Sequence, residues 1–556
     1  MNTHETAHGL PVLVVGAGPV GLTVATELAR RGVPVRCVDR APAPSTLSKA
    51  LLVWPRTLQV LRGLGDAEAI ARRSMPLDSF RYYSSARQIA RIGFNARTRP
   101  VILPQPDIED VLRDALTVAG GKPEWNTGLI GLTQEPDRVR ATLATGAGTV
   151  EEEFRYVVGC DGAGSTVRSL LGLDFDGMTY PNTFMLADAR VGGAIQHDAA
   201  HYYCSPRGVL VMIGLPDGRF RVFTSAPPDL APADATLGLL QEMVDQRGPG
   251  GLTLHDDQWT STFAVHARHA DRYRIGRVFL AGDAAHIHSP AGGQGLNTGV
   301  TDAHNLAWKL ALAWHGHARD ALLASYEPER AQVARAVVRQ ADLQTKAWLI
   351  RKPAQVLLRD TAVRAAASTR LFDRDYVPWL TGLRTAYLQG AVVGGDGKRP
   401  SGRARERGFV PGALVPPLEV APADGGGPRQ LSDALSDLRH TLLVVGDGPQ
   451  RPSGPGDAPG AEASPLAEAV AALGPEVLRI RRLDPDGRLG ADSGTLPSVP
   501  GSRLVLVRPD LHIAACGTAA DPSPILAYLH GHLFAAPRTV DTAAFEIGGR
   551  MLSSRF

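Results

Sequence analysis

The segment LPVLVVGAGPVG, residues 10–21, decides the fold of the N-terminal part of the chain. Its first half is a compact, valine-rich apolar run, which is typical of a parallel strand buried on both faces. Its second half is a complete G-x-G-x-x-G pattern formed by Gly16, Gly18 and Gly21. Such glycines allow a tight turn, the close approach of a pyrophosphate and tight packing of the next helix on the strand. The segment therefore predicts the strand, phosphate loop and helix that begin a Rossmann-like domain.

The residues after this loop complete a dinucleotide-binding unit. The predicted helix closes at Arg30-Arg31-Gly32, with basic residues in its last turn and glycine just beyond it. A second apolar strand, Val35 to Val38, ends at Asp39, about twenty residues past the glycines, where an acid can bind ribose hydroxyls. The predicted ligand is a dinucleotide with a free adenosine ribose, which is FAD or NAD.

Two later segments repeat the pattern of a strand, an acid and a glycine-containing loop that opens a helix. In FRYVVGCDGAGSTVR, residues 154–168, Asp161 follows the strand and Arg168 lies one turn into the helix. In GRVFLAGDAAHIHSPAGGQGLN, residues 276–297, Asp283 follows the strand and a glycine-rich loop leads into the next helix. Exposed backbone N–H groups and the helix dipole suit such loops to oxygen-bearing groups. These segments, and the loop that replaces a prompt βαβ return after Asp39, favour FAD over NAD.

The three motifs, in this order, resemble those of the FAD-dependent aromatic hydroxylases, the class A flavoprotein monooxygenases. The match spans residues 12–335 and points to the branch of polyketide hydroxylases, phenol-hydroxylase-like enzymes and rifampicin monooxygenases. The resemblance implies FAD as cofactor, NADPH as reductant, O2 as co-substrate and a polycyclic phenolic substrate of polyketide type. It implies hydroxylation through a flavin C4a-hydroperoxide, and the sequence identifies no catalytic base.

The same resemblance implies cofactor contacts for individual residues. Asp39, where the family more often has glutamate, would bind the adenosine ribose, and Asp283 would hold the ribityl hydroxyls. Asp161 and Arg168 match a motif with a role toward both FAD and NADPH. The residues implied to bind cofactor are Gly16, Gly18, Pro19, Val20, Gly21, Asp39, Arg40, Lys49, Gln105, Leu129, Asp161, Arg168, Asp283, Pro290, Gly293, Gly295, Leu296 and Asn297.

Some of these assignments have a plain structural alternative. Lys49 is either near the FAD phosphates or a solvated surface lysine, and Gln105 is either a flavin contact or a helix-entry residue. Arg40 and Arg56 are either cofactor-facing or exposed, and Leu129 would contact adenine through its backbone. His286 and His288 invite a metal or general-base role, but a third ligand at useful spacing is missing, so packing beside the flavin loop is favoured.

Composition places the rest of the chain in an α/β fold. Residues 1–177 and 271–335 are expected to form the FAD-binding domain, and the alternating strands of residues 178–270 an inserted antiparallel substrate-binding sheet, which residues 78–102 join. Candidate cavity-lining residues on that sheet, each equally explained as structural, are His201, Tyr202, Tyr203 and Arg221. Residues 336–389 would be a helical connection and residues 390–556 a thioredoxin-like α/β domain without CxxC, structural or used in self-association.

The overall composition narrows the function classes. The 556 residues are 44% hydrophobic and 21% charged, as in soluble globular proteins. We expect a cytoplasmic protein, because neither a signal-peptide pattern nor an apolar run of membrane-spanning length is present. We also expect it to be a monomer or a homodimer. The net charge of +3, without a basic block, argues against nucleic acid. The four cysteines form no CxxC, so neither a dithiol nor a zinc site is expected.

Other functions remain open at this point. Baeyer–Villiger oxygenation or epoxidation could use the same scaffold, and a non-catalytic flavoprotein could sequester an aromatic ligand. A flavin halogenase is disfavoured because no tryptophan is followed two residues later by another. A plain NAD-dependent dehydrogenase is weaker still.

Overall fold

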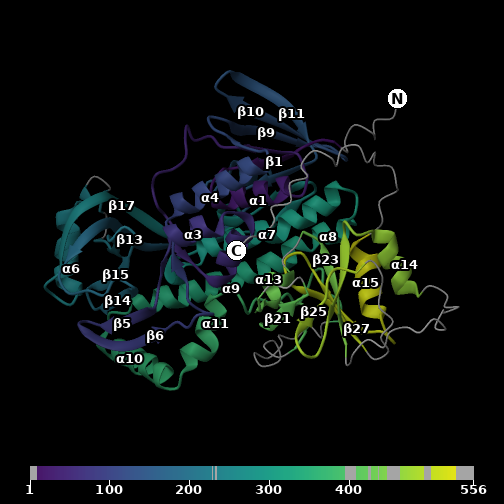
Figure 1. Cartoon of the computed structure of the whole chain (residues 1–556). Helices are drawn as coiled ribbons and strands as arrows, with labels where there is room; N and C mark the ends of the chain where they lie inside the picture. The colour runs from purple at the N-terminus through teal and green to yellow at the C-terminus, as the bar shows by residue number, and fades with distance from the viewer. Residues whose placement is uncertain are drawn as a thin grey trace.

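The computed structural model describes residues 9–227, 230–231, 234–394, 408–423, 427–435, 438–446, 464–493 and 502–533. Within these residues the chain forms a mixed α/β fold around three large sheets (Figure 1). A six-stranded, largely parallel sheet lies at the centre, an eight-stranded, largely antiparallel sheet on the left and a seven-stranded mixed sheet at the lower right. This arrangement confirms the predicted fold class.

The central sheet has the strand order β18-β19-β12-β1-β2-β8. Its strands are β1 (Val12–Val15), β2 (Val35–Val38), β8 (Pro123–Glu124), β12 (Tyr156–Gly159), β18 (Arg274–Ile275) and β19 (Val278–Leu280). All four residues of β1 are buried, as expected for a strand covered on both faces. Around the sheet lie α1 (Pro19–Ala29), α4 (Gln105–Val118), α5 (Thr166–Leu170), α7 (Gly295–Trp314) and the strands β9 (Gly128–Gln134), β10 (Val139–Thr145) and β11 (Gly148–Phe154).

Four loops leave the central sheet on the same side, at the carboxyl ends of its parallel strands. The strands β19, β12, β1 and β2 are adjacent and parallel, so their carboxyl ends point the same way. The loops that follow them carry Asp283, Asp161, Gly16 and Asp39 respectively. The sequence predicts that these four loops bind a cofactor, and we use the term cofactor cleft as the name of the four loops together. A ligand site at the carboxyl ends of parallel strands is the general rule for such sheets.

The eight-stranded sheet has the order β20-β17-β13-β16-β15-β14-β5-β6. Its strands are β5 (Ser79–Ser84), β6 (Arg87–Gly93), β13 (Phe175–Gly192), β14 (Ala199–Ser205), β15 (Gly208–Gly214), β16 (Phe220–Ser225), β17 (Thr253–Ala270) and β20 (His286–Ile287). The central strands β14, β15 and β16 are buried along their whole length. The helix α6 (Leu237–Arg247) packs on one face of the sheet. β20 comes from the loop after β19, so this loop belongs to both sheets.

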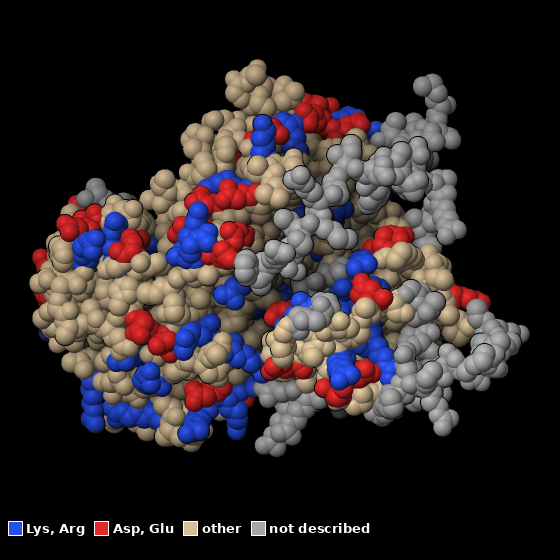
Figure 2. Space-filling view, in the orientation of Figure 1, with Lys and Arg blue, Asp and Glu red and all other residues tan. Residues whose placement is uncertain are grey.

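Helices connect these sheets to the C-terminal part. They are α2 (Pro55–Leu64), α3 (Ala67–Arg73), α8 (Asp320–Ala324), α9 (Tyr326–Trp348), α10 (Pro353–Ser368), the π turn Phe372–Tyr376 and α11 (Val377–Leu380). A small separate sheet is formed by the short strands β3 (Leu52–Val53), β4 (Met75–Pro76) and β7 (Val101–Ile102). α9 runs without interruption across residue 335, where the helical connection was expected to begin. α10 is largely exposed, and Lys and Arg gather over α10 and β6 at the lower left of Figure 2.

The C-terminal sheet has the order β22-β21-β25-β24-β23-β26-β27. Its elements are β21 (Glu419–Pro422), β22 (Arg429–Gln430), α13 (Leu431–Leu435), β23 (His440–Val445), α14 (Pro465–Leu473), β24 (Leu478–Leu483), β25 (Arg488–Leu489), β26 (Arg503–Val507), β27 (Ile513–Thr518) and α15 (Ser523–His532). Trp308 of α7 and Leu322 of α8 lie in its apolar core. The sheet therefore shares a core with the cofactor-binding part. Residues 534–556 of the expected C-terminal domain lie outside the described residues.

Two further properties concern the described residues as a group. None of their helices is both long enough and apolar enough to cross a membrane. All four cysteines are described and are free thiols, and Cys37, Cys160 and Cys204 are buried. Burial raises the pKa of the Cys37 thiol to about 12, so this thiol stays protonated and unreactive.

Candidate functional site

The glycine loop after β1 is packed so tightly that it requires glycine at two positions. Gly16 has a φ of 103°, and a Cβ there would lie 2.4 Å from the carbonyl oxygen of Cys160. A Cβ on Gly21 would lie 1.8 Å from the Gly16 carbonyl oxygen. α1 begins at Pro19 without a side-chain cap, so its first backbone donors face the loop. The first motif thus forms an open helix N-terminus at the cofactor cleft.

Asp39 connects the loops after β1 and β2. One carboxylate oxygen accepts a 2.8 Å hydrogen bond from the Ala17 N–H, and the other accepts a 2.8 Å bond from the Ala41 N–H. Each oxygen keeps a free lone pair, so Asp39 can still accept from a ribose hydroxyl. Nearby, Leu129 is buried in the core, which leaves only its backbone for the expected adenine contact.

Asp161 and Arg168 hold the second motif together. The Asp161 carboxylate accepts hydrogen bonds from the Ser165 hydroxyl at 2.5 Å and the Thr166 N–H at 2.6 Å, and so caps α5. Arg168 is buried and donates to the carbonyl oxygens of Ala163 at 2.7 Å and Ala284 at 3.0 Å. Arg168 therefore ties this loop to the turn that carries Asp283. A direct contact of either side chain with FAD or NADPH stays a prediction.

Asp283 lies on a short turn, residues 282–284, that directly follows β19. Its side chain reaches solvent, but protein atoms surround it closely, and this desolvation raises the pKa of the carboxyl. The charges of His286 and Lys49 act in the opposite direction. Lys49 is exposed and close enough for its charge to be felt at Asp283, so it is a cation at the rim of the cleft.

The loop before α7 is shaped by left-handed glycines. Gly292 and Gly293 have φ values of 78° and 61°, and a Cβ on Gly293 would lie 2.7 Å from a methyl group of Leu52. No side chain caps the N-terminus of α7. The N–H groups of residues 295–297 belong to its first turn, where backbone donors have no partner one turn earlier. The predicted helix therefore begins at Gly295, and its first turn has no side-chain cap.

Asn297 and Trp54 fix this loop from behind, and sequence reasoning missed Trp54. The Asn297 side chain accepts from the Trp54 N–H at 2.8 Å and donates to the Leu52 carbonyl at 2.8 Å. The Trp54 indole N–H donates to the Gly292 carbonyl at 2.9 Å. The available signal was a tryptophan immediately before Pro55, the first residue of α2.

Three lesser candidates take different positions. Gln105 lies beside the Lys49 loop, where its side chain accepts from the Ala50 N–H at 3.3 Å, and its backbone donates to the Ala50 carbonyl. Arg40 is exposed. Arg56 is neither exposed nor directed at the cleft, because it is buried and donates to the Asp510 carbonyl at 2.8 Å. The expectation for Arg56 was wrong because the C-terminal sheet covers it.

The two histidines of the third motif have protein partners. His286 is buried, with Nε2 2.6 Å from an Asp302 carboxylate oxygen. His288 Nδ1 lies 2.7 Å from the Ser289 carbonyl oxygen, and burial lowers the pKa of His288 to about 4. Among the described residues, no group of three His, Cys, Asp or Glu side chains is placed to hold a metal ion. The packing interpretation agrees with these contacts.

The face of the eight-stranded sheet toward α9 is aromatic. Tyr202 stacks on Tyr82 at 4.8 Å, and Phe184 stacks on Phe263 at 5.6 Å. His201 and Tyr203 stack on each other with Tyr83, on the opposite face toward α6, because successive strand residues alternate. Of the four cavity candidates, Tyr202 and Arg221 are therefore on the α9 side.

Arg221 links this aromatic face to the cofactor cleft. Its guanidinium pairs with the Asp188 carboxylate at 2.7 Å and approaches the Lys49 carbonyl at 3.4 Å. The Trp259 indole N–H donates to the same carboxylate at 3.0 Å. The pair is buried and would face a ligand that lay between the sheet and the Lys49 loop.

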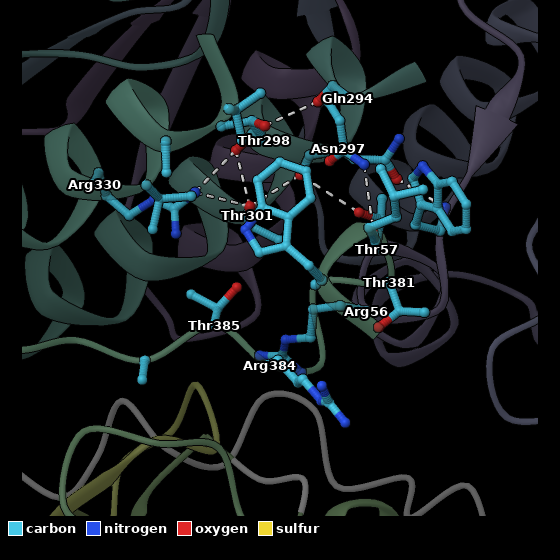
Figure 3. Close-up of a pocket in the computed structure, with 18 of the residues that line it drawn as sticks. Arg56, Thr57, Gln294, Asn297, Thr298, Thr301, Arg330, Thr381, Arg384 and Thr385 are labelled. Carbon is cyan, nitrogen blue, oxygen red and sulfur yellow. Dashed lines mark hydrogen bonds between the residues drawn. The ribbon is translucent and has the colours of Figure 1, made fainter. Parts of the chain in front are cut away.

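A cavity of about 180 Å³ lies beside the N-terminal half of α7, where Gln294 and Asn297 are among its lining residues (Figure 3). Its walls come from α2, α7, α9, the segment after α11 and the C-terminal sheet. Threonine side chains and the guanidinium of Arg330 line it, and Arg330 points at Thr298 and Thr301 in Figure 3. Sequence reasoning did not predict this cavity or the contact of α7 and α9 with the C-terminal part around it, which we call the junction.

Comparison with known proteins gives consistent matches. The family model described as an FAD binding domain matches residues 9–341. The 6-methylpretetramide 4-monooxygenase of Streptomyces rimosus is 33% identical over 98% of this chain and 97% of its own length. The rifampicin monooxygenase of Streptomyces venezuelae is 35% identical over 59% of this chain and 69% of its own length.

Solved structures resemble nearly the whole chain. The OxyS anhydrotetracycline hydroxylase from Streptomyces rimosus has a TM-score of 0.72 at 29% identity and covers 95% of this chain and 99% of that one. An aklavinone-11 hydroxylase, solved as a ternary complex with FAD and aklavinone, has a TM-score of 0.73 at 26% identity over 96% and 99%.

Proposed function

Because the chain belongs to the FAD-binding-domain family of aromatic flavoprotein monooxygenases, we propose that it uses NAD(P)H and O2 to hydroxylate a polycyclic phenolic substrate of polyketide type. The observation that carries the proposal is the cofactor cleft. Three loops whose motifs resemble those of FAD-dependent hydroxylases, and the loop that carries Asp39, follow adjacent strands at the carboxyl ends of one parallel sheet. The central sheet is then the FAD-binding unit and the eight-stranded sheet the substrate-binding unit.

The residues of the cleft fit FAD. The open N-terminus of α1 suits a pyrophosphate, because no side chain or Cβ fills the space beside Gly18. Asp39 has free lone pairs for the adenosine ribose, and the accessible Asp283 suits the ribityl hydroxyls. The uncapped first turn of α7 would bind the pyrimidine edge of the flavin ring through its N–H groups.

FAD, when bound, would supply the redox chemistry that takes a hydride from NAD(P)H and passes one oxygen atom of O2 to the aromatic ring. The residues of this chain would bind FAD and the substrate, orient them relative to each other and shield them from water. The positive end of the α7 dipole stabilises negative charge that develops at the pyrimidine edge. The aromatic face of the substrate sheet excludes water from the reacting carbon.

The substrate class follows from the aromatic face and from the relatives. Stacked side chains such as Tyr82 and Tyr202 suit a flat, fused ring system. The named relatives act on 6-methylpretetramide and anhydrotetracycline, and a structural neighbour binds aklavinone. The Arg221–Asp188 pair, at the end of the sheet near Lys49, would fix a phenolic hydroxyl relative to the flavin.

The test is a turnover assay on the purified, FAD-loaded protein. NADPH or NADH oxidation is measured with a panel of polycyclic phenols, and the product is analysed by mass spectrometry under ¹⁸O₂. We expect a panel member to stimulate oxidation and to gain a single ¹⁸O atom. Absence of bound flavin would refute the whole proposal.

The same assay separates the alternatives. A lactone or an epoxide would place the chain among Baeyer–Villiger enzymes or epoxidases. Tight binding of a phenol without faster flavin reduction would indicate a protein that sequesters its ligand.

A further inference from the structure

We propose that the C-terminal sheet is a working part of the cofactor site, because Arg508 and Asp510 position the turn that carries Asp283. The inference rests on the proposed function, since it assumes that this turn binds FAD. The connection runs through side chains of α7, α9 and the segment after α11, all in the described part of the chain.

The first link is Asp302 of α7, which holds both ends of the Asp283 turn. One oxygen of its fully buried carboxylate accepts from the Gly282 N–H at 3.2 Å and lies 2.6 Å from His286 Nε2. Gly282 and His286 flank Asp283. A shift of the Asp302 carboxylate therefore moves the backbone from which the Asp283 side chain projects.

The second link is Arg330 of α9, which holds Asp302. Its Nε donates to the other Asp302 oxygen at 2.6 Å. Its remaining nitrogens donate to the Thr301 hydroxyl at 2.9 Å and the Tyr387 hydroxyl at 3.1 Å. Figure 3 shows Arg330 directed at α7 across the cavity wall. All three guanidinium nitrogens therefore donate hydrogen bonds, and these bonds fix α7 against Tyr387.

The third link joins Tyr387 to the C-terminal sheet through Asn305 of α7. The Asn305 amide nitrogen donates to a Glu329 oxygen at 2.8 Å and lies 3.2 Å from both the Tyr387 hydroxyl and an Asp510 oxygen, which share its second hydrogen. Arg508, just after β26, makes two bonds to Glu329, at 2.7 and 2.9 Å, and a third to Asp510 at 3.0 Å.

Six oppositely charged side chains of the described residues pair with one another at this junction, and the buried Arg56 lies beside them. Its cations are Lys309, Arg330 and Arg508, and its carboxylates are Asp302, Glu329 and Asp510. None of the six side chains is more than 2% exposed. Buried charges tolerate little displacement, because each loses its solvation and depends on its partners. Arg508 and Asp510 therefore help to set the positions of the other buried charged side chains at the junction.

Apolar packing makes the connection rigid. Trp308 of α7 is fully buried in the core of the C-terminal sheet. The Arg508 guanidinium lies 5.2 Å from the ring centre of Trp308 and 5.2 Å from that of Tyr387. Close-packed interiors transmit displacement rather than absorb it.

The test compares two tyrosine variants at this junction. Tyr387→Phe removes the hydroxyl that joins Arg330 to Asn305. Tyr528→Phe removes an equally buried hydroxyl, bonded to His440 Nε2 at 3.1 Å in the same C-terminal core but outside the path to Asp302. Titration of the apoprotein with FAD gives the dissociation constant, and hydrogen–deuterium exchange reports on residues 278–289 of the apoprotein.

We expect Tyr387→Phe to weaken FAD binding about three- to tenfold, the value of one buried hydrogen bond. It should also speed exchange in residues 278–289. Tyr528→Phe should change neither, although both variants should lower the melting temperature. An equal loss of FAD affinity in both variants, or no change of affinity and exchange in Tyr387→Phe, would overturn the inference. Wild-type protein that binds no FAD would refute the proposed function, and faster exchange in Tyr387→Phe would then uphold only the positional link.

Discussion

The two sides of α7 treat polar groups in opposite ways. On the cofactor-cleft side, backbone donors of its first turn and the Asp283 carboxylate are left accessible. On the other side, three cations and three carboxylates of the described residues are completely buried and satisfy one another. The same helix therefore offers unsatisfied groups to a ligand on one side and uses satisfied groups as structure on the other.

The same difference separates Asp283 from Asp302, the α7 residue whose carboxylate binds the Asp283 turn. Desolvation raises the pKa of Asp283, the charges of His286 and Lys49 reduce that effect, and the charge of Asp302 adds to it. Desolvation would also raise the pKa of Asp302, but the charges and hydrogen bonds of Arg330 and His286 outweigh it and lower the pKa. Asp302 is therefore committed to its partners, whereas Asp283 still gains from a hydrogen-bonding ligand.

The largest expected effect is on stability and comes from breaking the buried side. Arg508→Met leaves Glu329 and Asp510 with less positive charge than they need. Removal of one partner of a buried ion pair costs roughly 3–5 kcal/mol. Urea unfolding of the variant and the wild type measures the difference.

The double variant Glu329→Gln/Arg508→Met is the control for that change. It restores the balance of charge, so its loss should be clearly smaller than that of Arg508→Met alone. Losses that simply add would show that the two residues act independently, and the comparison of the two sides of α7 would fail.

The next effect is on cofactor binding and comes from the open side. Asp283→Ala removes a carboxylate that would accept from ribityl hydroxyls, and a hydrogen bond to a charged group is worth about 1.5–3 kcal/mol. We expect FAD affinity to fall about tenfold or more, while stability of the apoprotein stays within about 0.5 kcal/mol. FAD-replete Asp283→Ala protein with normal turnover would contradict the assignment.

Acid should destabilise the buried side in a defined range of pH. Desolvation lowers the pKa of His512 from 6.5 to about 4, against the opposing charge of Asp510. Between these values the unfolded chain binds more protons, so stability is lost as the pH falls from about 6.5 to 4. Each proton contributes up to about 1.4 kcal/mol per pH unit. His512→Gln should flatten the profile of unfolding free energy in this range, and an unchanged slope would contradict the prediction.

The smallest effect is expected at the rim of the cleft. Lys49→Gln should leave stability within about 0.5 kcal/mol, because the side chain is exposed. If Lys49 lies near the FAD phosphates, FAD affinity should fall a few-fold at low salt, and the difference should shrink as salt screens the charge. Equal FAD affinity of the two proteins at low salt would identify Lys49 as an ordinary surface lysine.

The sequence was sufficient for the parts of the molecule that depend on local requirements. Gly16 and Gly21 are demanded by contacts within a single βα turn, and each acid of the cleft directly follows its own strand. Such features leave a motif in consecutive residues, so the central sheet, the order of its loops and the α7 start were all predictable. The short strand runs within residues 178–270 likewise predicted the antiparallel sheet that contains β15 and β16, although β14 was not predicted as a strand.

The junction behind α7 was not predictable, because its members are far apart in the chain. Glu329 and Arg508 are 179 residues apart, and nothing near either residue indicates its partner. Arg56 was misread for the same reason, since the carbonyl oxygen that it binds belongs to Asp510. Sequence reasoning could not separate His201 and Tyr203 from Tyr202, because a strand buried on both faces has no alternation of polarity to show which residues share a face.

The short strand β20 gives the two binding units one stretch of backbone in common. His286 and Ile287 pair with His269 and Arg268 of β17, only a few residues before the loop that opens α7. A ligand that displaced β17 would therefore also displace the backbone beside the loop that we propose binds the flavin. We expect a ligand at one proposed site to change the affinity of the other, and because such coupling is reciprocal the factor would be the same in both directions.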